Sequence, residues 1–218
     1  MGGPSSLFGT FSIVFICSGN RFRSPLAAAF VRQLTLGLPL EVESFGTLEL
    51  GNLPALPEAC QIGLACGLDL ADHRTRTLGP ETAAHADLVL GFEPEHARYA
   101  VLYAGARRER SFMLREFLSL LEGLEPADTN DPVARAKEAV AAASTRRASM
   151  PGGPTESIAD PIGKPWKVYR ETADEIRALT ITLAEVLFGV IDAPSRLPEP
   201  DAQLWPNAAN AAAFVRKR

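Results

Sequence analysis

The sequence lacks any apolar run of membrane-spanning length, and it contains few cysteines. In the chain of 218 residues the first apolar segment, Phe11 to Cys17, has no basic residues before it and no small-residue cleavage site after it. We therefore expect neither a membrane span nor a signal peptide. The three cysteines are too few for a disulfide framework in a chain of this length. These absences predict a cytoplasmic protein.

The sequence also lacks an excess of positive charge. It has 22 Lys and Arg residues against 26 Asp and Glu, a net charge of −4. This balance provides no chain-wide attraction for a polyanion, so we expect no nucleic-acid partner. With 46% hydrophobic and 22% charged residues, the composition is that of an ordinary globular protein. At about 150 residues per domain, the length predicts one domain with additional segments.

Short β-branched and aromatic segments alternate with segments of helical periodicity. The first, Phe11 to Ile16, is mostly apolar, which is typical of a strand buried on both faces of a parallel sheet. Alternation at these spacings predicts βαβ units and an α/β domain with helices on both faces of the sheet. Further strands are expected at Leu40 to Phe45, Asp87 to Phe92 and Ser111 to Leu114, and helices at Pro25 to Leu34, Leu56 to Cys66 and Trp166 to Phe188.

Changes in composition divide the chain into regions. Residues 1–10 read as a lead-in, 11–190 as the domain, and the Pro/Ala-rich stretch 191–218 as an extended tail. Within the domain, residues 123–157 interrupt the alternation of strands and helices with Gly, Pro, Ala, Thr and Arg. We interpret this segment as a surface insertion that holds at most one weak Ala-rich helix near Pro132 to Ala143.

The most informative motif is a C-x5-R-S segment between the first predicted strand and the first predicted helix. It runs from Cys17 to Ser24, and the following Pro25 suits the first turn of a helix. A tight loop there turns backbone N–H groups inward, and the helix N-terminus adds partial positive charge. Gly19 and Asn20 are residue types that adopt the positive φ such a loop needs. The segment predicts an anion-binding loop made of Ser18, Gly19, Asn20, Arg21 and Phe22.

Cys17 and Arg23 stand at opposite ends of this loop. The guanidinium of Arg23 can fold over a bound oxyanion and hold two of its oxygens. Helix N-termini and nearby arginines lower a cysteine pKa from about 8.5, so we expect Cys17 to be a thiolate placed for attack at phosphorus. The alternative is that Cys17 is only a small buried apolar residue at the end of a strand, as most free cysteines are.

This loop, together with an Asp-Pro pair late in the chain, resembles the low-molecular-weight protein tyrosine phosphatases, including their bacterial relatives. The pair here is Asp160-Pro161, and the similarity extends from about residue 11 to residue 188. The resemblance implies a flavodoxin-like, doubly wound domain whose four parallel strands have the order 2-1-3-4, with the site at the carboxyl end of the first strand. Weaker similarity lies in Ser44-Phe45-Gly46-Thr47, Gly67-Leu68-Asp69, His73-Arg74-Thr75, Leu78, Ala86 to Leu90 and Leu114-Arg115-Glu116-Phe117.

The resemblance implies a role for each matching residue. Cys17 looks like the nucleophile that forms a phosphocysteine, and Arg23 like the ligand of the phosphoryl oxygens. Ser24 resembles the hydroxyl that hydrogen-bonds the sulfur, and Asn20 the residue that holds the loop in shape. Asp160 resembles the acid that protonates the leaving phenolate and then, as a base, activates water.

The activity that the resemblance implies is that of a cysteine-dependent protein tyrosine phosphatase. Its partner would be a phosphorylated protein, carrying phosphotyrosine, or a small phosphomonoester, and its product inorganic phosphate. No metal and no cofactor is implied, because backbone amides and Arg23 supply the stabilising charge.

A second Asp-Pro pair, Asp131-Pro132, competes with Asp160 for the role of the acid. Asp160 is followed by Gly163 and then by a long predicted helix, as the family pattern requires. Asp131 instead begins an Ala-rich polar stretch, where Asp-Pro is more simply the start of a helix. We therefore assign the acid to Asp160.

The sequence departs from the family pattern in and around the loop. Where many members carry a second cysteine, this chain has Phe22, so the loop offers Cys17 no partner for a protective disulfide. Directly after Asp-Pro, where many members have an aromatic residue that stacks on the phosphotyrosine ring, it has Ile162. Arg21 is either a charge at the rim that attracts phosphate or a solvated side chain. The expected substrate wall consists of Ile162 with Leu48, Leu50 or Leu53, and Trp166 or Tyr169 as possible aromatic surface.

Two other functions stay open at this point. Thiol-dependent arsenate reductases share the loop, but they relay a disulfide through cysteines after the third strand, where Gly91 to His96 contains none. A non-catalytic phosphoprotein-binding module would need neither Cys17 nor Asp160, although Ile162 and the insertion keep that interpretation open.

The remaining cysteines and histidines form no motif. Cys60 and Cys66 lie nearly two helical turns apart with no third ligand nearby, so we expect core residues rather than a metal site. His73, His85 and His96 are expected at the surface or at helix caps.

Overall fold

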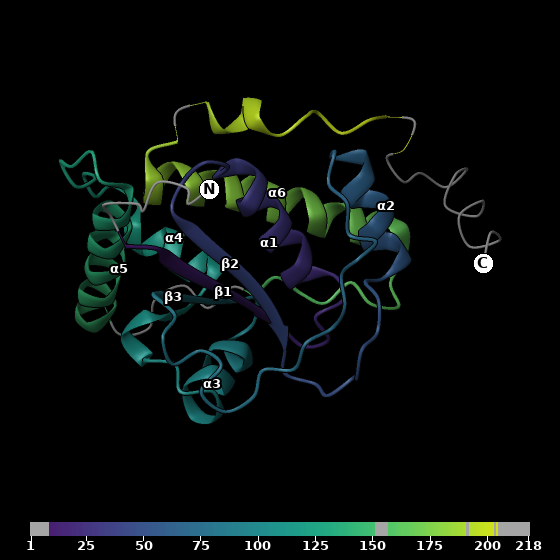
Figure 1. Ribbon diagram of the computed structural model, residues 1–218, viewed down its shortest axis with the longest axis horizontal. Coiled ribbons are helices and arrows are strands. Elements are labelled where there is room, and N and C mark those ends of the chain that lie inside the picture. Colours follow the sequence, from purple (N-terminus) through teal and green to yellow (C-terminus); the bar gives the residue numbers. More distant parts are fainter. Residues whose placement is uncertain (1–8, 151–156, 191, 203, 205–218) are drawn as a thin grey trace, which may run out of the picture.

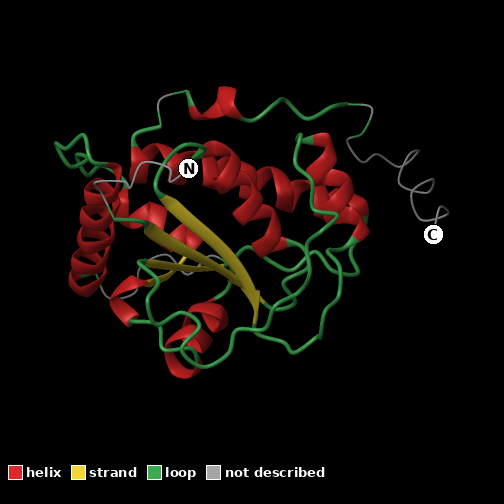
Figure 2. Cartoon of the chain, viewed as in Figure 1, coloured by secondary structure: helices red, strands yellow, loops and turns green. Residues whose placement is uncertain are grey.

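The computed structural model describes residues 9–150, 157–190, 192–202 and 204, and it shows a four-stranded sheet with helices on both faces (Figures 1 and 2). The strand order is β2-β1-β3-β4, and all pairs are parallel. This confirms the expected flavodoxin-like α/β fold and its strand order. The strands are β1 (Phe11–Cys17), β2 (Leu40–Gly46), β3 (Leu88–Gly91) and β4 (Ser111–Met113).

The carboxyl ends of the strands meet at one edge of the sheet. In the register of β1 with its neighbours, Cys17 pairs with Gly46, and Ile16 pairs with Gly91. β1 lies between β2 and β3, so the chain winds in opposite directions on its two sides. A crevice outside the carboxyl ends is therefore expected beside β1, where the predicted anion-binding loop begins.

Two apolar cores of unequal size lie on the two faces of the sheet. The larger core packs β1 against α1 and α6, and the smaller one packs the other face against α3 (Figure 1). Both faces of the sheet are thus covered, which explains why β1 is apolar at nearly every position. The helices are α1 (Arg23–Leu34), α2 (Pro57–Ala65), α3 (Pro94–Tyr103), α4 (Leu114–Leu121), α5 (Pro132–Ser149) and α6 (Trp166–Phe188).

The helix α5 is longer and better packed than the sequence predicted. It spans 18 residues and buries Val133, Ala136, Val140 and Ala143 in the larger core. Its composition concealed this, because its apolar face has only two valines, and the rest of it is alanine, including the partly buried Ala139 and Ala142. Residues 123–157 are therefore more than a surface insertion, since their helix packs against α4 and α6.

The described part of the expected tail does not extend away from the domain. Residues 192–202 run back over α1 and α6 toward α2 (Figure 1). Leu197 is buried there, and the backbone N–H of Asp201 donates to the carbonyl oxygen of Ala65 at 2.8 Å. Residues 205–218 and most of the lead-in lie outside the described residues. Within the described part of the chain, no helix has the length and apolar character needed to cross a membrane.

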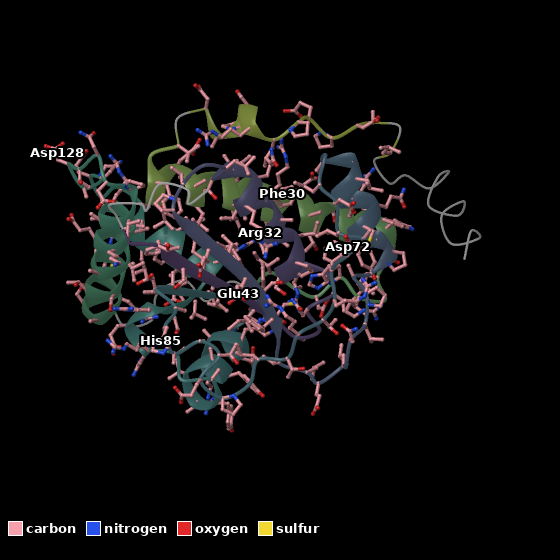
Figure 3. All side chains as sticks on the ribbon, viewed as in Figure 1. Phe30, Arg32, Glu43, Asp72, His85 and Asp128 are labelled. Atoms are coloured by element: carbon pink, nitrogen blue, oxygen red, sulfur yellow. The ribbon has the colours of Figure 1, made fainter. Side chains whose placement is uncertain are left out.

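Arginine side chains cover the edge of the sheet formed by β2. Arg32 donates to the carbonyl oxygen of Val42 from Nε at 3.0 Å and from Nη2 at 2.6 Å. Arg76 donates to the carbonyl oxygen of Ser44 at 3.2 Å and pairs with Glu43. Figure 3 shows Arg32 and Glu43 beside this edge. Because these carbonyls are occupied, β2 is protected against pairing with another strand.

Arg147 joins the end of α5 to the edge strand β4. Its guanidinium donates to the carbonyl oxygen of Ser111 at 2.7 Å and to that of Arg108. It also lies over the ring of Phe112 at 4.0 Å from the centroid, and Glu116 is 3.7 Å away. Arg147 thus satisfies backbone carbonyls and covers an aromatic ring at the same time.

We expect Arg147→Ala to lower the free energy of unfolding by about 1–3 kcal/mol, because it leaves partly buried carbonyls without a donor. Urea denaturation of the whole protein measures this loss. Lys137→Ala, an exposed position on the same helix, serves as the control. Equal stability of the two variants would contradict the role assigned to Arg147.

Candidate active site

The loop between β1 and α1 is shaped by one residue of positive φ. Asn20 has a φ of 51°, as the sequence predicted, whereas Gly19 does not lie in the positive region, and that part of the prediction was wrong. At Gly19 an added Cβ would approach Leu50 Cδ1 at 3.4 Å, an ordinary contact. The turn of the loop therefore depends on Asn20 alone.

The Asn20 side chain ties the loop to its surroundings. Its Nδ2 donates to Ser24 Oγ at 2.9 Å and to Ser44 Oγ at 3.0 Å, and its Oδ1 accepts from the backbone N–H of Arg76 at 2.9 Å. Its backbone carbonyl lies 2.7 Å from His73 Nε2, which must act as the donor. Burial lowers the pKa of His73, so the neutral imidazole with its proton on Nε2 fits this contact. The buried amide thus holds the loop from inside.

The sulfur of Cys17 lies at the base of the loop and is buried. Ser24 Oγ lies 3.0 Å from Sγ, and the backbone N–H of Asn20 donates to Sγ at 3.2 Å. No described residue accepts the backbone N–H groups of Ser18, Gly19, Arg21 or Phe22. The loop therefore presents a nucleophilic atom with hydrogen-bond donors around it, and its amides are open to an oxyanion.

Gly46 allows the loop to lie against the end of β2, a requirement that sequence reasoning missed. A Cβ added at Gly46 would lie 2.8 Å from the carbonyl oxygen of Ser18 and 3.1 Å from the backbone nitrogen of Asn20. These are backbone atoms, so a side chain here would displace the loop. The sequence offered two signals, its place at the end of a predicted strand and its position within the segment Ser44-Phe45-Gly46-Thr47.

Arg23 is a buried cation surrounded by acceptors. Its side chain is 1% exposed, and Nη1 donates to Glu93 Oε2 at 2.7 Å and to the carbonyl oxygen of Ile158 at 2.9 Å. Nη2 donates to Asp160 Oδ2 at 2.8 Å and to Ser18 Oγ at 3.3 Å. These bonds fix the guanidinium beside the loop, where it can contact a bound oxyanion.

The structure separates the two Asp-Pro pairs. Asp160 lies at the site, with Oδ2 on Arg23 and Oδ1 accepting from the backbone N–H of Ile162 at 3.2 Å. Asp131 instead caps α5, since its side chain accepts from the backbone N–H of Val133 at 2.8 Å. The helix-start interpretation of Asp131 is thus confirmed.

Phe22 and Tyr169 connect the loop to the segment that carries Asp160. The ring of Phe22 is 2% exposed and packs edge-on against Tyr169, with centroids 5.2 Å apart. The hydroxyl of Tyr169 accepts from the backbone N–H of Gly163 at 3.0 Å, and burial raises the pKa of Tyr169. Tyr169 is therefore an internal support and offers no aromatic surface to a substrate.

The rim of the site is aliphatic and basic. Leu48 and Ile162 are 53% and 47% exposed, and Leu50 is half-buried beside Gly19. Arg21 is half-buried, and its Nε donates to the carbonyl oxygen of Pro54 at 3.0 Å, so it is anchored rather than freely solvated. Trp166 is also half-buried and packs on Tyr169, with centroids 5.9 Å apart.

The remaining candidates occupy different places. Cys66 is buried in the core, and burial raises its pKa to about 11. No group of three or more potential metal ligands occurs among the described residues. His85 is exposed, whereas His96 is buried and caps α3 with its Nε2 3.1 Å from Ser18 Oγ. A capping role for His96 was among the expectations, but its contact with the loop was not.

Comparisons with known proteins agree with this geometry. A family model described as low molecular weight phosphotyrosine protein phosphatase matches residues 12–146. A protein-arginine-phosphatase of Geobacillus stearothermophilus is 28% identical over 177 residues, 81% of this chain and 96% of that protein. The low molecular weight protein-tyrosine-phosphatase Etp of Escherichia coli (strain K12) is 30% identical over 115 residues, 53% of this chain and 76% of that protein. The crystal structure of a low molecular weight protein tyrosine phosphatase from T. tengcongensis superposes with a TM-score of 0.59 and 28% identity, covering 81% of this chain and 99% of that chain.

We expect Gly46→Ala to weaken inhibition by inorganic phosphate and to lower activity on para-nitrophenyl phosphate by about tenfold or more, because it displaces the loop. Gly79→Ala is the control, since its Cβ would meet nothing closer than Thr82 Oγ1 at 3.6 Å. Unchanged phosphate inhibition in Gly46→Ala would show that the close approach has no functional importance.

Proposed function

The chain belongs to the low molecular weight phosphotyrosine protein phosphatase family, and from this premise we propose that it hydrolyses phosphotyrosine on proteins through a phosphocysteine intermediate. The observation that carries the proposal is the convergence of a buried cysteine, a buried arginine and a carboxylate at one loop. Cys17 Sγ lies at the base of open backbone amides, and Arg23 beside it is 2.8 Å from Asp160. These groups supply a nucleophile, an oxyanion ligand and a proton donor.

In the first step, the Cys17 thiolate attacks phosphorus, so an S–P bond forms as the P–O bond to the leaving group breaks. The loop amides and Arg23 hold the phosphoryl oxygens, whose charge they stabilise throughout the transfer. Nη1 of Arg23 donates to Glu93 and to the carbonyl oxygen of Ile158. Among the described residues, the acceptors of Nη2 are Ser18 and Asp160. That nitrogen is available to a phosphoryl oxygen that replaces one of them.

Asp160 supplies the proton for the leaving oxygen. When a phosphoryl oxygen takes its place on Arg23 Nη2, Oδ2 of a protonated Asp160 faces the leaving group and transfers its proton as the P–O bond breaks. The resulting carboxylate then accepts a proton from water, which attacks the phosphocysteine and releases inorganic phosphate. Ser24 Oγ, 3.0 Å from Sγ, stabilises the sulfur as it departs.

Phosphoarginine is the second candidate substrate. Ile162 stands directly after the Asp-Pro pair and offers no ring for stacking on a phenyl group, while Tyr169 is buried and Trp166 is half-buried against it. The protein-arginine-phosphatases of Geobacillus stearothermophilus and Bacillus subtilis match 96% and 95% of their lengths. The anchored cation Arg21 favours phosphotyrosine, because it repels a guanidinium at the rim.

We expect the wild type to hydrolyse para-nitrophenyl phosphate without added metal and Cys17→Ser to be inactive, since the serine lacks the reactive sulfur. Asp160→Ala should lower kcat by about 10²- to 10⁴-fold, the usual contribution of general acid–base catalysis, chiefly because hydrolysis of the phosphocysteine loses its base. His85→Ala, an exposed position, is the control for substitution alone. pH profiles of kcat and of kcat/KM with chelator present measure all of these. An inactive wild type that still binds vanadate would support the binding-module alternative instead.

We expect kcat/KM to be higher for a phosphotyrosine peptide than for a phosphoarginine peptide of the same sequence, and both to exceed that for phosphoserine. Phosphate release measured side by side decides the order. An Arg21→Thr variant should shift the ratio of the two kcat/KM values toward the phosphoarginine peptide, because it removes the repelling charge. A wild-type preference for phosphoarginine would reject phosphotyrosine as the substrate while leaving the phosphocysteine mechanism intact.

A further inference from the structure

His96 lies in the first turn of α3, where its side chain is buried and reaches the phosphate-binding loop. Its ring is 3% exposed, and Nδ1 accepts from the backbone N–H groups of Phe92 at 3.2 Å and Glu93 at 3.1 Å. An Nδ1 that accepts from two amides carries no proton, so in the neutral imidazole the proton resides on Nε2. The contacts of α3 therefore set the tautomer of His96.

The proton on Nε2 points toward the loop. Ser18 Oγ lies 3.1 Å from Nε2 and acts as the acceptor, and Ser18 is the residue directly after Cys17. The same Ser18 oxygen accepts from Arg23 Nη2 at 3.3 Å. His96 thus determines which way the Ser18 hydroxyl presents its lone pairs, and Ser18 in turn meets the guanidinium.

Glu93 connects Arg23 back to His96. Its Oε2 accepts from Arg23 Nη1 at 2.7 Å and lies 3.5 Å from His96 Nε2. The contacts therefore form a closed cycle of four residues, His96, Ser18, Arg23 and Glu93. This cycle joins the loop to the start of α3. α3 lies on the sheet face opposite α1 (Figure 1). The cycle of contacts therefore holds the loop from the α3 side of the sheet.

The first turn of α3, which carries His96, packs closely against the end of β3. A Cβ added at Gly91 would lie 2.7 Å from His96 Cβ and 3.1 Å from the backbone nitrogen of Ala97. Only a glycine at the end of β3 permits this approach. The close fit argues that the place of His96 is determined by the fold, rather than by a chance contact at the surface.

We propose that His96 is a positioning residue for phosphoryl transfer, which acts through Ser18 to orient Arg23 and the first amide of the loop. It touches neither the sulfur nor the phosphoryl group. The inference rests on the proposed function, because orientation of Arg23 matters only where a phosphoryl group is bound there.

The environment keeps His96 in the state that the proposal needs. Burial and the charge of Arg23 lower the pKa of His96 to about 4, against the opposing effects of Glu95 and Asp160, and Glu93 also faces the ring. The imidazole therefore stays neutral, and Nε2 stays a donor, over the whole range from pH 5 to 8 in which an unperturbed histidine would titrate. His96 should add no ionisation of its own to the pH profile in that range.

The test is His96→Asn, compared with His85→Asn at an exposed position. The asparagine oxygen can still accept from the backbone N–H groups that begin α3, but the side chain is too short to reach Ser18. We expect kcat/KM for para-nitrophenyl phosphate to fall by about 10- to 100-fold and phosphate inhibition to weaken, with the shape of the pH profile unchanged between pH 5 and 8. His85→Asn should behave as the wild type.

A double-mutant cycle with Ser18→Ala separates positioning from a general loss of structure. If His96 acts through Ser18, the double variant should be no slower than the slower single variant. Multiplicative losses, or unchanged kinetics in His96→Asn, would overturn the inference. If His96→Asn does not fold, Ser18→Ala alone decides, because wild-type kinetics and phosphate inhibition in that variant would also overturn it. Inactivity of the wild type in the same series would instead reject the proposed function.

Discussion

The site depends on a buried positive charge, the guanidinium of Arg23. Removing a charge from water costs several kcal/mol, and that cost is offset only where acceptors surround the group. Here the acceptors are Ser18 from the loop, Glu93 from the start of α3, and Ile158 and Asp160 from the segment before α6. Because these segments are far apart in the chain, the charge is compensated only when the sheet is assembled. Folding of the domain and formation of the site are therefore one event.

The same dependence explains what the sequence could predict. Local signals were sufficient for β1 and α1, since an apolar strand, a C-x5-R-S loop and a proline-led helix are all read within a short window. The choice of Asp160 over Asp131 needed the family pattern together with the long helix that follows. The position of Asp160 on Arg23, a contact 137 residues apart in the chain, had no local signal.

Other features escaped sequence reasoning for physical reasons. Gly46 and Gly91 look like ordinary strand ends. Gly46 permits the close approach of the phosphate-binding loop, and Gly91 that of the first turn of α3. His96 looked like a cap, and its contact with Ser18 arises from the packing of α3 against the sheet. The apolar face of α5 gave only a weak signal in the sequence, because alanine buries little area per residue. Packing of this face against α4 and α6 stabilises the helix.

The central claim is that Cys17 carries the phosphoryl group during turnover. The most direct measurement is rapid quenching with base of Asp160→Ala during reaction with para-nitrophenyl phosphate, followed by mass spectrometry of the peptides under alkaline conditions. Para-nitrophenolate leaves without much help from an acid, while loss of the base slows hydrolysis, so phosphocysteine should accumulate. The account predicts one added phosphoryl group on the peptide that contains Cys17. A phosphoryl group on His73 or His96, or burst-free turnover with no phosphorylated peptide, would contradict it.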